Sequence, residues 1–157
     1  MLNALLFSMP IIRFNKSAVF KYDIQEKLEA GIELQGWEVA AIKAGSVELQ
    51  GSFVKTLGGE VYWINAHVTP LKQQKGKLEA DRTRRLLLRR SQIAALTAET
   101  LRQGLTIVPL KLYTIRSLIK LEIGLARGKK KYQQSLTKKK QTEERKMKQD
   151  AKEAGIR

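Results

Sequence analysis

The sequence predicts a mainly β protein, and three observations lead to this fold class. Between residues 11 and 126 apolar side chains mostly alternate with polar ones, which is the period of half-buried strands. Glycines interrupt this pattern at short intervals, and a single stretch has the spacing of a solid helix. Five to seven short strands, one main helix and one or two short helices are typical of a small closed β-barrel. For a basic chain of this size we expect the oligonucleotide-binding (OB) type.

With translation from Met9, the segment MPIIRF is expected to be the first strand. A further strand is expected at Val19–Ile24, where apolar and polar side chains alternate. Gly31 precedes the next stretch and Gly36 interrupts it, and we interpret Ile32–Val39 as another strand. Ala40–Ala44 has room for one helical turn, which Gly45 would end. Ser52–Thr56 and Glu60–Ile64 are separated by a Gly-Gly pair that favours a tight turn, so they predict a β-hairpin.

The second half of the body begins with the apolar run Leu86–Leu88, a short strand between arginines. Ser91 can cap a helix from Gln92 to about Gln103, which Gly104 would end. The residues expected to face inward on this helix are Ile93, Leu96 and Leu101. Two further strands are predicted near Leu105–Tyr113 and Leu118–Ala126.

The chain of 157 residues has a net charge of +15, and this charge is unevenly distributed. Residues 127–157 hold 12 basic and 4 acidic side chains, a net charge of +8, and few apolar ones. Such a segment buries too little apolar surface to offset its ordering entropy, so we expect a basic tail that is disordered or becomes helical on binding. The excess positive charge predicts a polyanion as partner, with nucleic acid ahead of a membrane.

Three regions follow from this distribution: an apolar extension over 1–10, an RNA-binding barrel over 11–126 and the tail over 127–157. The extension is too short to span a bilayer, and it lacks the basic start and cleavage site of a signal peptide. Translation from Met9 rather than Met1 is the favoured interpretation of this segment. No membrane partner is expected.

The sequence does not predict an enzyme. Cysteine is absent, and no glycine-rich phosphate loop precedes a helix. We interpret His67, the single histidine, as hydrogen-bonded inside or beside the barrel. Glu26, Glu29 and Glu33 would share a face only if their stretch were helical, and we interpret them as solvated. We therefore expect no catalytic residue, no metal site and no cofactor.

Two basic clusters favour RNA binding. Arg82, Arg84 and Arg85 precede the Leu86–Leu88 strand and Arg89-Arg90 follow it, so the guanidinium groups could clamp phosphates at a barrel edge. The second cluster joins the body to the tail and combines a glycine, three lysines and an aromatic ring that can stack on a base. It consists of Arg127, Gly128, Lys129, Lys130, Lys131 and Tyr132.

Ordered blocks of residues resemble those of the SsrA-binding protein family (small protein B) over about residues 11–132. The blocks are Asn15-Lys16, Glu29-Ala30-Gly31-Ile32-Glu33-Leu34-Gln35-Gly36-Trp37-Glu38-Val39, Ala44-Gly45, Asn65-Ala66-His67-Val68, Arg82-Thr83-Arg84-Arg85-Leu86-Leu87-Leu88, Gly104-Leu105-Thr106-Ile107-Val108-Pro109-Leu110, Lys120 and Ala126-Arg127-Gly128-Lys129-Lys130. So many matches in order and spacing make the resemblance specific for this family.

The resemblance implies a cytoplasmic protein, monomeric when free, that binds the tRNA-like domain of transfer-messenger RNA (tmRNA). It also implies delivery of that RNA to stalled ribosomes for trans-translation, with the tail in the decoding centre and the mRNA channel. The family's RNA-binding residues fall on Glu29, Leu87 and Lys120. Glu29 could accept hydrogen bonds from a base or a 2′-hydroxyl, or orient an Arg or Lys; Leu87 could pack on a base or fill the barrel.

The resemblance assigns the decoding-centre contacts to the tail. These residues are Gly128, Lys129, Lys130, Lys131, Tyr132, Lys138, Lys139 and Lys140. The family's Asp-Lys-Arg after the aromatic residue is replaced here by Gln133-Gln134-Ser135, which puts the efficiency of the tail in doubt. Arg116-Ser117 replaces the family's Asn-Gly turn. The alternative function is a structural ribosomal or general RNA-binding protein.

Overall fold

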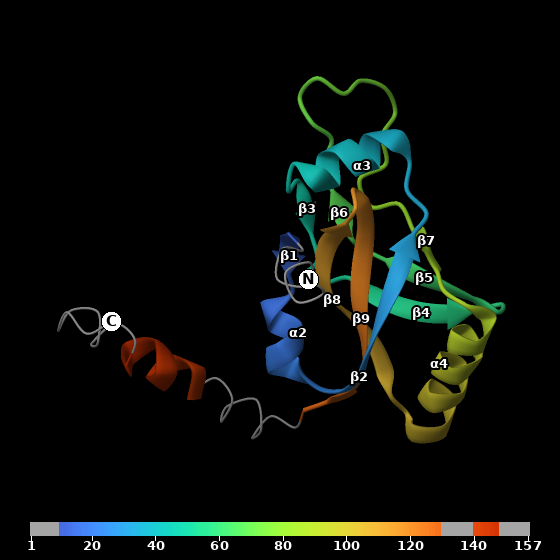
Figure 1. Ribbon diagram of the computed structural model, residues 1–157, viewed down its shortest axis with the longest axis vertical. Coiled ribbons are helices and arrows are strands. Elements are labelled where there is room, and N and C mark those ends of the chain that lie inside the picture. The colour runs from blue at the N-terminus through green and yellow to red at the C-terminus, as the bar shows by residue number, and fades with distance from the viewer. Residues whose placement is uncertain (1–9, 130–139, 148–157) are drawn as a thin grey trace.

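The computed structural model describes residues 10–129 and 140–147 (Figure 1). The strands are β1 (Ile11–Phe14), β2 (Tyr22–Ile32), β3 (Val47–Glu48), β4 (Phe53–Leu57), β5 (Glu60–Ile64), β6 (His67–Val68), β7 (Arg84–Leu87), β8 (Thr106–Ile115) and β9 (Leu118–Gly128). The helices are α2 (Lys16–Lys21), α3 (Gly36–Lys43) and α4 (Arg90–Gln103). Residues 140–147 are also helical.

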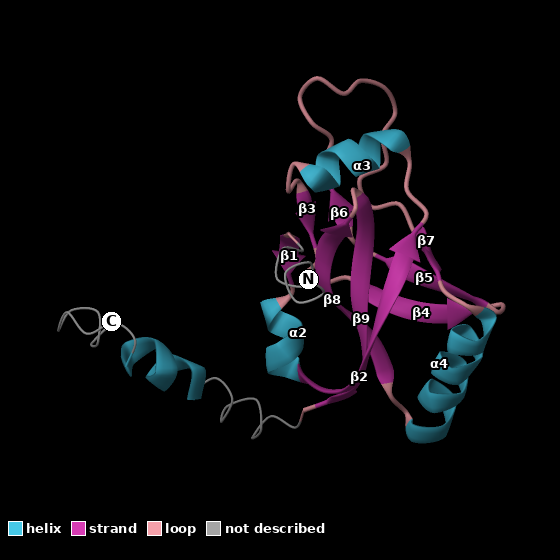
Figure 2. Ribbon diagram, in the orientation of Figure 1, coloured by secondary structure: helices cyan, strands magenta, loops and turns pink. Residues whose placement is uncertain are grey.

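The strands confirm the predicted mainly β class. Seven strands form one antiparallel sheet in the order β1-β8-β4-β5-β7-β2-β9, and β9 pairs with β8 as well (Figure 2). β3 and β6 form a separate two-stranded sheet near α3. The inward side chains of the larger sheet, among them Trp63, Leu86, Leu112, Leu121 and Ile123, make the core together with Ala41 and Ile42 of α3.

Several predicted elements are confirmed. β4 and β5 form the expected hairpin around Gly58-Gly59, paired from Phe53 with Ile64 to Leu57 with Glu60. Helix α4 ends at Gly104, whose φ of 62° is the left-handed cap that glycine favours. The helix begins at Arg90 instead of after a Ser91 cap, a difference of two residues.

Three local predictions were wrong. Ile32–Val39 is not one strand, because the Gln35 backbone N–H donates to Glu38 in a capping box that begins α3. The first part of Val19–Ile24 is helical, and Ala18 of that helix packs in a small apolar cluster with β8 and β9. Leu101 is 81% exposed, since it lies about 140° around α4 from the buried Leu96.

The turn between β8 and β9 keeps a two-residue loop although its sequence lacks glycine. Ile115 pairs with Leu118, and the intervening Arg116 and Ser117 have φ values of 48° and 69°. Both residues are therefore in the left-handed region, which two-residue hairpin turns require and in which L side chains are strained.

Replacing this turn by Arg116→Asn with Ser117→Gly is expected to raise the free energy of unfolding by about 1 kcal/mol, because Asn and Gly adopt positive φ at lower cost. Denaturant unfolding measures the change. Arg116→Ala is the matched control, since it removes the same side chain without relieving the backbone. Equal stabilisation by both variants would contradict this account of the turn.

Candidate nucleic-acid interface

A groove of about 1370 Å³ lies between helix α4 and strands β2, β7 and β9. Its lining combines cationic, acidic and apolar side chains. It includes Glu29, Gly31, Glu60, Arg85, Leu87, Arg89, Arg90, Leu101 and Lys120. The three residues that the family resemblance assigned to RNA binding are all among them.

Strand register brings these three residues together. Gly31 on β2 pairs with Leu87 of β7 on one side and with Lys120 of β9 on the other. Paired residues of antiparallel strands point to the same face, so Leu87 and Lys120 flank Gly31 on the outside of the sheet. Glu29 is two residues before Gly31 and therefore shares that face. Residues distant in the chain thus form one surface of the groove.

Gly31 leaves the centre of this surface without a side chain. A Cβ atom at Gly31 would lie 3.2 Å from the Leu87 Cβ, closer than nine in ten real contacts of this kind. Leu87 remains 48% exposed, whereas its neighbour Leu86 is buried in the core. Leu87 is therefore not part of the core, and the prediction that it packs on a base remains a prediction.

Cations are concentrated at the rim of the groove. Arg89 and Arg90 are exposed where α4 begins, and Lys120 is half-buried. Within the described ranges, none of these three side chains forms an ion pair with an acidic side chain. Arg85 differs, because it pairs with Glu33 at 2.8 Å and Glu60 at 3.5 Å. The hydrogen bond from Arg85 to Glu33 raises the pKa of the guanidinium, which stays charged.

Glu29 has a partner that sequence reasoning missed. The Tyr113 hydroxyl donates to Glu29 Oε2 at 2.6 Å, and Tyr113 is only 5% exposed. Burial, followed by this hydrogen bond to a carboxylate, raises the pKa of Tyr113, so the phenol remains a donor. No Arg or Lys pairs with Glu29 in the part of the chain that the structure describes. The sequence placed Tyr113 on a strand and held no signal for this contact.

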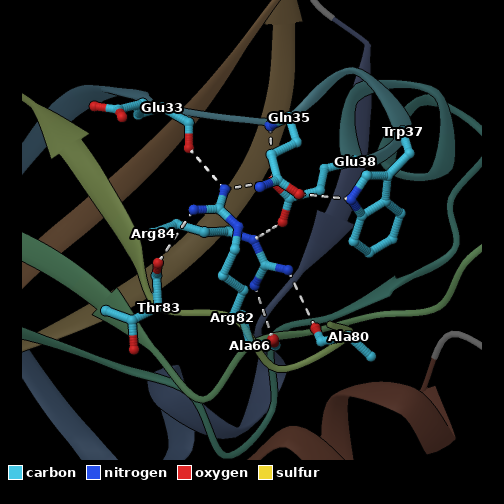
Figure 3. Close-up of polar contacts among 9 residues, drawn as sticks. All are labelled: Glu33, Gln35, Trp37, Glu38, Ala66, Ala80, Arg82, Thr83 and Arg84. Atoms are coloured by element: carbon cyan, nitrogen blue, oxygen red, sulfur yellow. Dashed lines mark hydrogen bonds and ion pairs between the residues drawn. The ribbon is translucent and has the colours of Figure 1, made fainter. Parts of the chain in front are cut away.

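Glu38 lies at the centre of a buried polar cluster beneath the turn between β2 and α3 (Figure 3). Its two carboxylate oxygens accept hydrogen bonds from Arg82 and Arg84, and Oε1 also accepts from the Gln35 backbone N–H at 2.8 Å. Burial by itself raises the pKa of Glu38, but these hydrogen bonds outweigh it and lower the pKa. The carboxylate is therefore ionised and paired.

The cluster corrects the prediction that Arg84 clamps phosphate. Arg84 is fully buried and lies over the Trp63 ring, 5.9 Å from its centroid. Besides Glu38, its guanidinium donates to the carbonyl oxygens of Ala66 at 3.0 Å and Ala80 at 3.1 Å (Figure 3). With its donors satisfied inside the protein, Arg84 anchors β7 and does not reach a ligand.

Arg82 is intermediate between the buried Arg84 and the exposed Arg85. Its side chain is 25% exposed, and it bridges Glu38 and the backbone oxygen of Glu33 at 3.3 Å (Figure 3). Of the five arginines predicted to form a clamp, Arg85, Arg89 and Arg90 line the groove, whereas Arg82 and Arg84 do not.

The remaining predicted residues lie outside the groove or outside the described ranges. His67 Nδ1 is 2.7 Å from Asp81 Oδ1 at the surface, which agrees with a hydrogen-bonded histidine beside the sheet. Gly128 ends β9, the Lys129 backbone N–H donates to Lys21 O at 2.9 Å, and Lys140 is the first described residue of a helical segment. The other predicted tail residues, Lys130, Lys131, Tyr132, Lys138 and Lys139, lie outside the described residues, as does the 1–9 segment.

Among the described residues, no group of three acidic or histidine side chains could hold a metal ion. None of the described helices is both long and apolar enough to cross a membrane.

The sheet and the groove define a small, basic β protein whose outer face suits a polyanionic ligand with apolar parts. The family model described as "SmpB protein" matches residues 12–153, and the chain belongs to this family. An SsrA-binding protein of Cupriavidus necator is 42% identical and covers 88% of this chain and 97% of its own. Another, of Methylobacillus flagellatus, is 48% identical over 75% of this chain and 78% of its own.

A solved structure has the same fold. It is described as "tmRNA-SmpB: a journey to the center of the bacterial ribosome", and it superposes with a TM-score of 0.63 at 40% sequence identity. The match covers 76% of this chain and 85% of the other.

Proposed function

We propose that this protein binds the tRNA-like domain of tmRNA and delivers it to stalled ribosomes for trans-translation. One observation carries the proposal: Glu29, Leu87 and Lys120, which the family resemblance assigned to RNA binding, lie together on one groove. The names of the relatives and the ribosomal context of the solved structure support the same function.

The groove has groups suited to each part of a nucleotide. The Lys120 ammonium and the Arg89 and Arg90 guanidinium groups suit phosphates, and Leu87 offers an apolar surface to an unstacked base. Glu29 is an acceptor for a base edge or a 2′-hydroxyl. Arg85 contributes positive charge that is partly neutralised by Glu33 and Glu60.

The closure of the sheet and the separate roles of the folded body and the tail are also part of this proposal. We infer that the large sheet is a closed OB-type barrel, supported by the pairing of β9 with both β2 and β8. The barrel would bind RNA, and the basic tail after Ala126, from Gly128 to Lys140, would act in the decoding centre. We further infer a cytoplasmic, non-enzymatic protein that is monomeric when free.

A gel-shift titration against the tRNA-like domain, with bulk tRNA as competitor, tests the function. Tight binding that survives a large excess of tRNA is the expected result, because the groove combines several kinds of contact and does not rely on charge alone. Binding that equal tRNA abolishes would favour a structural ribosomal or general RNA-binding protein.

Glu29→Ala and Lys120→Ala are expected to weaken this binding by about tenfold each, and to differ in their salt dependence. Lys120→Ala removes a phosphate contact, so the slope of log affinity against log salt should become shallower by about 0.7–0.9. Glu29→Ala removes an acceptor and should leave the slope unchanged. A titration at four salt concentrations measures both. Identical slopes for the three proteins would contradict the assignment of Lys120 to phosphate.

Gly31→Val is expected to weaken binding by about tenfold while the protein still folds. The new side chain would meet Leu87 at the centre of the groove, since its Cβ atom alone would lie 3.2 Å from Leu87 Cβ. Gly36→Ala is the matched control, because a Cβ there meets no atom within 4 Å. Thermal unfolding measures stability and the gel shift measures affinity. Unchanged affinity in a folded Gly31→Val protein would exclude this face.

A further inference from the structure

The environment of Glu29 explains how an acidic side chain is held on a basic face. Glu29 on β2 and Glu122 on β9 are directly paired, so two carboxylates share the outer side of the sheet. Like charges in this position repel. Each carboxylate has a different partner on β8: Lys111 Nζ lies 3.7 Å from Glu122 Oε2, and the Tyr113 hydroxyl donates to Glu29 Oε2.

Tyr113 reaches Glu29 from a second hollow. This hollow of about 270 Å³ is lined by Tyr113, Lys111 and Glu122, and Glu29 lines both it and the larger groove. Glu29 therefore forms the boundary between the two. Among the described residues, the Tyr113 hydroxyl is the one hydrogen-bond donor to the Glu29 side chain, and it occupies Oε2.

We propose that Tyr113 is a positioning residue for RNA recognition, which fixes Glu29 through the bond to Oε2 and leaves Oε1 as a charged acceptor for the ligand. This inference rests on the proposed function and deepens it. A neutral phenol fixes the carboxylate without neutralising it, as Arg or Lys would. The group that Glu29 recognises must donate a hydrogen bond, as a base amino or imino group or a 2′-hydroxyl does, and a phosphate oxygen is excluded.

A double-mutant cycle with Tyr113→Phe and Glu29→Gln tests the proposal, with the tRNA-like domain as probe. Tyr113→Phe keeps the buried ring and removes only the hydroxyl, so it is expected to weaken binding about three- to tenfold. In the Glu29→Gln background the same change is expected to cost less than about twofold, because the carboxylate it positions is gone.

Tyr22→Phe is the matched control, because it removes a phenol hydroxyl at the start of β2, outside both hollows. Its affinity should equal that of the wild type. Thermal unfolding verifies that each variant is folded. The salt slope of Tyr113→Phe should match the wild type, since no phosphate contact is lost.

Two results would overturn the inference: no effect of Tyr113→Phe on affinity, or the same loss in the wild-type and Glu29→Gln backgrounds. Both leave the proposed function intact, because that function is judged by wild-type binding in the presence of competitor tRNA. If the wild type did not prefer the tRNA-like domain over bulk tRNA, the proposed function itself would be refuted.

Discussion

Glu38→Gln is expected to lower the free energy of unfolding by about 3–5 kcal/mol, the cost typical of breaking a buried ion pair. The substitution keeps the size of the side chain but removes its charge. Arg84, which is fully buried, would lose its counter-ion, and Arg82 would lose its main acceptor. Urea unfolding followed by circular dichroism measures the change.

Glu33→Gln is the control, because Glu33 pairs with the exposed Arg85 and exposed ion pairs contribute less than about 1 kcal/mol. Replacing both Glu38 and Arg84 by Met should recover much of the loss, since a buried pair can be exchanged for apolar side chains of similar size. Equal destabilisation by Glu38→Gln and Glu33→Gln would show that the buried cluster contributes no more than a surface pair.

The same cluster makes stability depend on pH. The pKa of Glu38 in the folded protein is below its ordinary value of 4.5, so the unfolded chain binds the proton more readily. The stability due to this carboxylate is therefore complete above pH 4.5 and is lost as the pH falls through the lower pKa of the folded state. The difference in the free energy of unfolding between the wild type and Glu38→Gln should therefore become smaller as the pH falls below 4.5.

The cluster also connects stability to the groove. Arg84 is the first residue of β7, and Arg85 and Leu87 of the same strand line the groove. Glu38 belongs to α3, which follows β2, so the ion pairs hold β7 beside the strand that carries Glu29 and Gly31. Side chains pointing alternately in and out of β7 thus divide the arginine cluster between the core and the surface.

This alternation shows how far the sequence could predict the site. The family motif predicted Glu29, Leu87 and Lys120 as RNA-binding residues, and strand register brings them together. The charge pattern could not separate Arg84 from Arg85, because only the pairing of β7 decides which of two adjacent arginines faces inward. Nothing near Glu38 in the chain indicates that its partners lie 44 and 46 residues away.

The fold was predictable where local signals and packing agree. The Gly58-Gly59 hairpin and the Gly104 helix end have specific backbone requirements that the sequence displays. The prediction of a strand over Ile32–Val39 was wrong. The apolar spacing of this segment suits a strand, but the capping box at Gln35 and the burial of Glu38 favour a helix. The hydrogen bond of Tyr113 could not be predicted because its partner, Glu29, is 84 residues away in the chain.

Truncation after Gly128 is expected to abolish ribosome rescue while leaving affinity for the tRNA-like domain within about twofold. It removes 11 basic and 4 acidic side chains, a net charge of +7, yet it leaves β9 whole and every groove residue in place. Local phosphate contacts should dominate binding over distant, screened charge. Gel shift measures affinity, and peptide tagging on a message without a stop codon, in reconstituted translation, measures rescue.

Full-length Lys120→Ala is the reciprocal control: it should bind RNA weakly but recover rescue when protein and RNA concentrations are raised, since its tail is intact. The truncated protein should not recover under the same conditions, because saturating the RNA cannot replace a missing contact inside the ribosome. If truncation weakened RNA binding as much as Lys120→Ala does, the tail would be part of the RNA-binding surface. The proposal that the folded part binds RNA while the tail acts only on the ribosome would then be wrong. The assignment of the groove residues to RNA binding would still stand.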